Sequence, residues 1–330
     1  MLTLKTYAFK RKFLKFIFSF LLTVSFSLSS EDFYRLGLGS CHDQDMEISA
    51  WESLKKENLD SFFFLGDNVY GDIPSGELGR LINAYETFKQ NKPQWFNEVE
   101  IFTIWDDHDY GMNDGGGDYK YKVESQKLFN DFWNIPQNDP RRYREGIYFS
   151  ELRDINNLKV LIIGLDTRYF RSNLDKKNGA YLQNKSEEAT ILGEQQWSWL
   201  QKQLDVEHDL LIIATSIQVL ATEHRFEKWS NFPNEREKLL NLLNGLDSNV
   251  LIISGDRHRS GVYQKDEIYE FTSSSLNVGI FPQSETDTLL KGKTYPENNY
   301  GIIDIYPTKL EISIKNENMS VLENYIIPIK

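Results

Sequence analysis

The chain has 330 residues, of which 40% are hydrophobic and 14% aromatic, and its formal net charge is −12. This composition excludes a disordered or low-complexity protein, and the length is sufficient for a large buried core. The negative charge also argues against a nucleic-acid-binding surface, because a strongly acidic protein repels a phosphate backbone.

The first thirty residues are typical of an export signal. Five basic residues precede an apolar run from Phe16 to Leu28, and small serines end the segment. This run is shorter than the roughly twenty residues that a membrane-spanning helix needs, and an uncleaved anchor is the alternative. We therefore expect residues 1–30 to be a signal peptide, with export to the periplasm, the cell surface or the medium, and membrane contact through this segment alone.

Removal of the five positive residues of this segment takes the formal net charge from −12 to −17. A substrate that carries phosphate would then need strong local positive charge inside its site. Metal ions supply such charge. The sequence leaves the oligomeric state open.

Beyond residue 30, short apolar runs alternate with helix-like segments, which predicts one α/β domain over residues 31–330. The expected strands, in chain order, are residues 34–38, 62–65, 101–104, 160–165, 210–214, 250–253, 267–271, 302–306 and 309–314. The expected helices are residues 47–58, 76–91, 122–133, 193–204 and 234–243. Pro307 and Thr308 form a turn signal, which predicts that the last two strands are antiparallel.

Polar residues directly follow several of these strands, and ligands in layered α/β proteins gather at such strand ends. The first of these loops begins Ser40, Cys41, His42, and Cys41 is the one cysteine of the chain. A thiolate beside a histidine is a candidate metal ligand, because a metal holds the thiol deprotonated. The alternatives are a buried, inert thiol and a cysteine nucleophile, which would also need an oxyanion hole.

The second loop contains Asp67 between Gly66 and Asn68, followed by Tyr70. Asp67 directly follows a strand, which suits a carboxylate that bridges two cations, although the same residue types are common in simple turns. The third loop, residues 105–114, holds four carboxylates, His108 and Asn113. Crowded carboxylates repel one another unless cations neutralise them, so this loop predicts a cation site; a solvated acidic loop is the alternative.

Two further loops carry candidate residues. Arg168 lies in the loop 166–171, where it or Arg171 could grip a phosphate oxygen with two hydrogen bonds; an ion pair with Asp166 is the alternative. Asp256 and His258 follow the strand 250–253 and can both turn towards one metal centre, unless they form an isolated surface turn.

Taken in order, five motifs resemble the PhoD-like family of alkaline phosphatases and phosphodiesterases. They are Gly-Ser-Cys, Gly-Asp-Asn-Val-Tyr, Trp-Asp-Asp-His-Asp, Leu-Asp-Thr-Arg-Tyr-Phe-Arg and Ser-Gly-Asp-Arg-His, which span residues 39–260. The resemblance implies a four-layer α/β/β/α metallophosphoesterase sandwich. The chain departs from the family pattern at Asn68, where the family has an aromatic residue, and we expect it to lack the family's longer N-terminal domain.

The resemblance also implies a site in which ferric iron lies beside calcium. Carried over by motif, the residues that hold iron are Cys41, Asp67, Tyr70 and Asp256, and Asp67 bridges towards calcium with Asn113. His108 and His258 fall in motifs that serve metal or substrate, and we expect them to take part in catalysis together with Arg168. The expected function is hydrolysis of phosphate monoesters or diesters, including phospholipid- or teichoic-acid-type diesters. A non-enzymatic calcium-binding surface module and a cysteine hydrolase are the alternatives.

Overall fold

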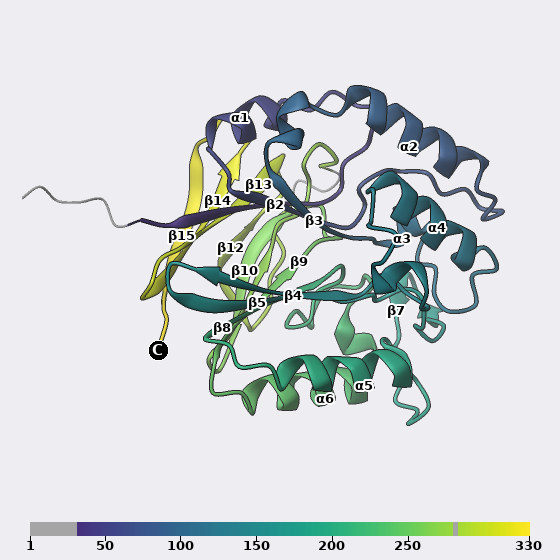
Figure 1. The fold of residues 1–330 in the computed structure, drawn as a ribbon. Coiled ribbons are helices and arrows are strands. Elements are labelled where there is room, and N and C mark those ends of the chain that lie inside the picture. The colour runs from purple at the N-terminus through teal and green to yellow at the C-terminus, as the bar shows by residue number, and fades with distance from the viewer. Residues whose placement is uncertain (1–31, 280–282) are drawn as a thin grey trace, which may run out of the picture. The chain divides into compact units, whose positions relative to one another are not determined.

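The computed structural model describes residues 32–279 and 283–330, so the expected signal peptide lies outside the described residues. The unit Asp32–Lys330 contains two large mixed β-sheets with helices on their outer faces (Figure 1). Within the described ranges, no helix has the length and hydrophobicity that crossing a membrane requires.

The first sheet has the strand order β15-β14-β13-β1-β2-β3. Its parallel part consists of β1 (Tyr34–Gly39), β2 (Ser61–Leu65) and β3 (Glu100–Ile104). Its antiparallel part consists of β13 (Asn299–Ile305), β14 (Lys309–Asn316) and β15 (Val321–Pro328). The expected antiparallel pair is confirmed, because β13 and β14 are joined by a turn in which the Tyr306 N–H donates to the Lys309 carbonyl at 3.0 Å.

The second sheet has the order β12-β10-β11-β9-β8-β5-β4. Its parallel strands are β5 (Leu158–Gly164), β8 (Leu210–Thr215), β9 (Asn249–Ser254) and β11 (Ile268–Thr272). Its antiparallel strands are β4 (Phe149–Ile155), β10 (Ser260–Lys265) and β12 (Leu290–Tyr295). A separate small hairpin pairs β6 (Lys176–Lys177) with β7 (Ala180–Tyr181).

Helices cover both outer faces. Figure 1 shows α1 and α2 above the first sheet and α5 and α6 below the second. The α-helices are α1 (Ala50–Lys56), α2 (Gly79–Asn91), α3 (Asp107–Tyr110), α4 (Lys122–Phe132), α5 (Gly193–Leu204) and α6 (Pro233–Asn244). Short 3-10 turns occupy Gln94–Asn97, Pro140–Arg142 and Trp229–Asn231.

The alternation of side chains along β2 explains the layering. Phe63 and Leu65 pack into a core that also contains Ile212 of the second sheet. Phe62 and Phe64 point the other way and pack with Phe88 of α2. Because successive side chains of a strand face opposite sides, a strand buried on both sides must lie between two layers. On the far side, α5 and α6 pack against the second sheet, which confirms the predicted α/β/β/α sandwich.

The two sheets bring their strand ends together. The Cys41 N–H after β1 donates to the Gly66 carbonyl after β2 at 3.4 Å. Gly255, which follows β9 of the other sheet, lies so close that a Cβ atom there would be 2.6 Å from Ser40 Oγ. Glycine is therefore required where the loops of the two sheets touch.

Candidate metal centre

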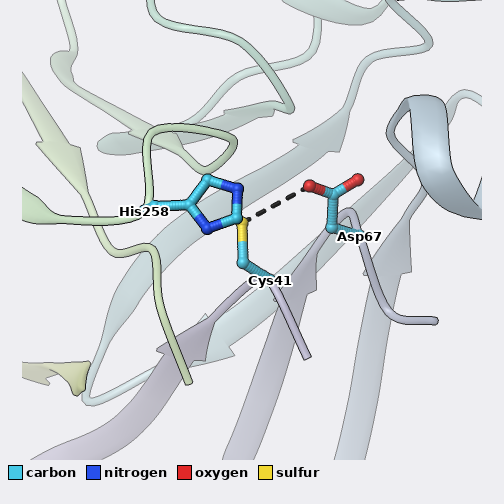
Figure 2. A group of neighbouring side chains, drawn as sticks. All are labelled: Cys41, Asp67 and His258. Carbon is cyan, nitrogen blue, oxygen red and sulfur yellow. Dashed lines mark hydrogen bonds between the residues drawn. The ribbon is translucent and has the colours of Figure 1, made fainter. Parts of the chain in front are cut away.

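Side chains from the loops after β1, β2, β3 and β9 meet at this junction. Among the described residues, three overlapping groups place potential ligand atoms within 4.8 Å of one another, and Asp67 belongs to all three. The first group is Cys41, Asp67 and His258, which Figure 2 shows side by side. The other two are Asp67, Asp107 and His108, and Asp67, Asp106, Asp107 and Asp256. The shared position of Asp67 suits a bridging ligand.

Several of these residues have left-handed backbone conformations. The φ angles are 56° at Cys41, 51° at Asp67, 64° at Asp256 and 52° at His258. A residue other than glycine rarely adopts this region, and each such residue costs on the order of 1 kcal/mol or more. Gly66, which precedes Asp67, has a φ angle of 98°, and a Cβ atom there would lie 2.6 Å from Asp106 Cβ. The chain therefore accepts local strain where it turns these side chains towards one point.

Cys41 is completely buried beside polar groups. Its Sγ donates to Asp67 Oδ2 at 3.4 Å and lies 3.0 Å from Ser274 Oγ. Burial, and then the negative charge of Asp67, raise the pKa of the thiol. Cys41 therefore keeps its proton in the absence of a cation, and a bound cation would favour the thiolate.

Asp106 and Asp107 show most directly that the site fits a cation. Asp106 Oδ1 accepts hydrogen bonds from Arg168 Nε at 2.5 Å and Ser216 Oγ at 2.6 Å, and Asp107 Oδ2 accepts from the Asp114 N–H at 2.7 Å. The second oxygen of each carboxylate is buried without a hydrogen-bond partner. Unpaired buried carboxylate oxygens are costly, and hard cations such as Ca²⁺ bind such oxygens. Burial raises the pKa of Asp106 and Asp67, although the charges of Arg168 and His108 respectively oppose this shift. Burial would also raise the pKa of Asp107, but the charges of His108 and Arg168 outweigh it and lower that pKa.

Asp109 has a different role from its acidic neighbours. Its carboxylate accepts hydrogen bonds from the backbone N–H groups of Asp106, at 2.6 Å, and Asp67, at 3.2 Å. The amide of Asn68 donates to it at 2.5 Å and to the Ile104 carbonyl at 2.8 Å. The amide nitrogen of Asn68, the residue that departs from the family pattern, thus joins the ends of β2 and β3.

His258 has the tautomer of a metal ligand. Its Nδ1 lies 2.6 Å from the Val278 carbonyl, which can only accept, so Nδ1 carries the proton and Nε2 is unprotonated. Nε2 lies 3.5 Å from the hydroxyl of Tyr70. Burial lowers the pKa of His258 to about 4, although the bond to Val278 opposes this shift. A neutral imidazole with an oriented second nitrogen is the usual form in metal sites.

His108 lies at the solvent-facing side of the group, with 19% of its side chain exposed. Its Nδ1 is 2.6 Å from Asp72 Oδ1, and its ring packs against that of Tyr70 with 4.1 Å between centroids. Burial alone would lower the pKa of His108, but the charges of Asp107, Asp67 and Asp72 outweigh it and raise the pKa to about 11. His108 therefore holds a proton beside the carboxylates when no cation is bound.

Arg168 and Asn113 occupy less direct positions. The Arg168 side chain is fully buried and bonds Glu227 Oε2 at 2.6 Å as well as Asp106, whereas the sequence had offered Asp166 as its partner. Asp166 accepts hydrogen bonds from the backbone N–H groups of Arg168 and Tyr169, each at 2.9 Å, and from the Trp105 indole, but not from the Arg168 side chain. Asn113 is exposed and donates to Asp114 Oδ2 at 2.8 Å. The expected contact of Arg168 with substrate stays a prediction, and so does the expected contact of Asn113 with calcium.

Sequence reasoning did not assign roles to four acidic residues of this region: Asp72, Asp106, Asp107 and Glu227. The crowding of carboxylates in residues 105–114 was the signal for the two that join the cation group. Glu227 gives no such signal, because it lies in an irregular segment between β8 and the turn Trp229–Asn231.

Comparison with known proteins places this geometry in context. The model of the PhoD-like phosphatase family matches residues 136–312. Alkaline phosphatase D of Bacillus subtilis is 20% identical over 304 residues, which cover 74% of this chain and 51% of that protein. The chain thus spans about half the length of this curated relative.

Three solved structures share the fold. A structure of PhoD matches with a TM-score of 0.65 and 17% identity, over 89% of this chain and 68% of that one. GAP50, described as the anchor in the inner membrane complex of Plasmodium, matches with a TM-score of 0.64 and 15% identity, over 90% of this chain and 89% of that one. The purple acid phosphatase PPD1 from yellow lupin seeds matches with a TM-score of 0.58 and 12% identity, over 90% of this chain and 54% of that one. At identities of 12–17%, these likenesses show a common fold.

Proposed function

Because the chain belongs to the PhoD-like phosphatase family, we propose that it is an exported, metal-dependent phosphoesterase that hydrolyses phosphate monoesters or diesters. The observation that carries this proposal is the pair of buried, unpartnered carboxylate oxygens on Asp106 and Asp107, grouped with Asp67 and Asp256. Such a group suits cations, and cations are what cleavage of a phosphate ester needs in a protein of negative charge.

The donor types support two different metals. Cys41, Asp67, Tyr70 and Asp256 are assigned to ferric iron, because thiolate and phenolate ligands suit a transition metal. His258 lies in the same group as Cys41 and is a further donor on this side. Asp67 with Asn113 is assigned to calcium, and the carboxylates of Asp106 and Asp107 add oxygen donors of the kind calcium prefers.

The metals and the side chains around them have separate roles in this proposal. When bound, the metals would polarise the phosphoryl oxygens as Lewis acids. His108 is assigned the transfer of a proton to the leaving alcohol, which its contact with Asp72 and its partial exposure support. Arg168 holds one oxygen of Asp106, so that the other oxygen remains directed towards the cation group.

Metal analysis together with paired assays tests this function. The purified protein is analysed for calcium and iron, then assayed on 4-nitrophenyl phosphate and bis(4-nitrophenyl) phosphate before and after dialysis against a chelator. We expect chelation to abolish hydrolysis, and calcium with iron to restore it. Full activity after prolonged chelation, with no metal detected, would contradict the proposal and favour a metal-independent hydrolase that uses Cys41. Bound calcium without hydrolysis of either ester would favour the non-enzymatic module.

A further inference from the structure

A cavity of about 600 Å³ opens beside the metal centre. It is lined by the loop 112–120 and by residues that precede and include the β6–β7 hairpin. This volume lies within the range of small-molecule sites, roughly 300–1,000 Å³, and far exceeds what one phosphate group fills.

Asp114 connects the cavity to the metal centre. Its backbone N–H donates to Asp107 Oδ2 at 2.7 Å, while its side chain lines the cavity and accepts a hydrogen bond from the hydroxyl of Tyr181 in β7. One hydrogen bond therefore separates a cavity wall from a carboxylate of the cation group. A second cavity of about 360 Å³, between α2 and α4, contains no residue of the three candidate ligand groups.

A hydrogen bond connects Asp114 and Arg171 of the cavity wall, and an ion pair joins Arg171 to Glu227. Arg171 Nη2 donates to the Asp114 carbonyl at 2.5 Å, and Arg171 Nε lies 2.8 Å from Glu227 Oε1. A Cβ atom at Gly116 would lie 2.7 Å from the Arg171 carbonyl, so glycine permits the close approach of this loop. These contacts hold part of the cavity wall in place, and a wall that needs no rearrangement reduces the entropic cost of binding.

The same contacts remove the two loop arginines as binders of a second phosphate. Both guanidinium groups are buried against carboxylates, Arg168 with Asp106 and Glu227, and Arg171 with Glu227. The charged residues that remain on the cavity wall are of both signs, namely Asp114, Asp118 and Lys120. A polyanionic group would gain little net attraction there.

The other wall residues favour rings and hydroxyl groups. Met112, Leu174 and the ring of Tyr181 offer apolar and aromatic surface, and Ser75 and Asn173 offer hydrogen-bonding groups. A simple alkyl chain would leave the polar groups unpaired, and a methyl group would leave the cavity empty. An uncharged alcohol that carries both a ring and hydroxyl groups satisfies both kinds of wall.

We propose that this cavity binds one ester group of a phosphodiester, and that the group is an uncharged, ring- and hydroxyl-bearing alcohol of the size of a nucleoside or sugar. This inference rests on the proposed function, which it narrows to a class of substrate. The specificity then comes from the loop 112–120 and from Asn173 and Tyr181, whereas the reacting phosphate lies at the metal centre.

Two diesters with the same leaving group test the proposal. The metal-loaded full chain is assayed on thymidine 5′-(4-nitrophenyl phosphate) and on methyl 4-nitrophenyl phosphate, so that the chemistry at the leaving 4-nitrophenolate is matched. We expect kcat/KM to be at least tenfold higher for the thymidine ester. Asn173→Trp places a large side chain at an exposed position of the cavity wall and should bring this ratio close to unity, mainly through KM.

Asn241→Trp is the matched control, because Asn241 is an exposed asparagine that lines a different cavity, on α6. It should leave the ratio unchanged. Tyr181→Phe removes the hydroxyl that bonds Asp114 and gives a second, smaller change in the wall if Asn173→Trp does not fold. Tyr181→Phe should lower the ratio of kcat/KM for the thymidine ester to that for the methyl ester by a smaller factor than Asn173→Trp.

Calorimetric binding of thymidine 5′-monophosphate and of inorganic phosphate separates the two proposals. If both diesters are hydrolysed at equal rates and the nucleotide binds no tighter than phosphate, the cavity assignment is overturned and the phosphoesterase assignment stands. If neither diester is hydrolysed but the nucleotide binds at least tenfold more tightly than phosphate, and Asn173→Trp removes this difference, the cavity assignment stands and the phosphoesterase assignment fails.

Discussion

Asp106 and Arg168 form an ion pair in the interior of the protein, with Arg168 Nε 2.5 Å from Asp106 Oδ1 and no exposed surface on either side chain. The pair satisfies one oxygen of Asp106 and leaves the other buried without a hydrogen bond, in the group that also contains Asp67. The same guanidinium bonds Glu227. We therefore propose that Arg168 positions a candidate metal ligand.

Arg168→Ala should strongly destabilise the fold, because Asp106 and Glu227 would remain as buried charges without a partner. The expected loss is about 3–5 kcal/mol, as for other buried ion pairs that lose one member. Urea denaturation of the variant and the wild type measures it. Lys159→Ala is the control, since Lys159 pairs with Glu207 at the surface and its removal should cause no measurable change. Equal stability of Arg168→Ala and wild type would contradict the buried pair.

Asp67→Asn should lower turnover rather than stability, in contrast to Arg168→Ala. It removes one negative charge from the ligand that all three groups share, so turnover should fall by more than about 100-fold, beyond the losses typical of residues that only support a ligand. Its melting temperature in chelator should not fall, because the lost charge lies among other buried carboxylates. Per folded molecule, the loss of turnover should exceed that of Arg168→Ala. Near wild-type turnover would show that Asp67 does not bridge metals.

Cys41→Ser should lower the iron content and the activity while the fold survives. No disulfide depends on this cysteine, and serine fits the space beside Asp67 and Ser274, so the expected cost in stability is about 1 kcal/mol. Elemental analysis, a thermal melt and an assay on 4-nitrophenyl phosphate measure the three effects. A variant that retains both its iron and its rate would reduce Cys41 to a packing residue.

Gly66→Ala should destabilise the protein by more than about 1 kcal/mol, because φ is 98° and the new Cβ would meet Asp106 Cβ at 2.6 Å. The displaced Asp106 should also weaken calcium binding. Gly79→Ala, at the start of α2, is the matched control, since no atom lies within 4 Å of the Cβ position there, and it should be neutral or stabilising. Similar denaturation midpoints for the two variants would show that the loop after β2 can relax.

The sequence by itself determined the central strands and the loops that follow them. Residues 62–65 form β2 as expected, because four consecutive apolar residues must be buried on both sides of a strand. The strands β4, β10, β12 and β15 and the short hairpin of β6 and β7 escaped prediction. β4 is an example: it is an antiparallel edge strand whose polar residues face solvent, so it lacks a continuous apolar pattern.

Only the tertiary structure decided which acidic side chains face the centre. In residues 106–109, Asp106 and Asp107 each keep one oxygen for the cation group, whereas Asp109 bonds the backbone of Asp106 and Asp67. These roles depend on left-handed turns and on partners such as Glu227, which is remote in the chain. Residue order along a loop predicts that charge will gather at a strand end. The carboxylates of Asp106 and Asp109 are oriented in part by hydrogen bonds to Arg168 and to the Asp67 N–H, which form only when distant loops meet.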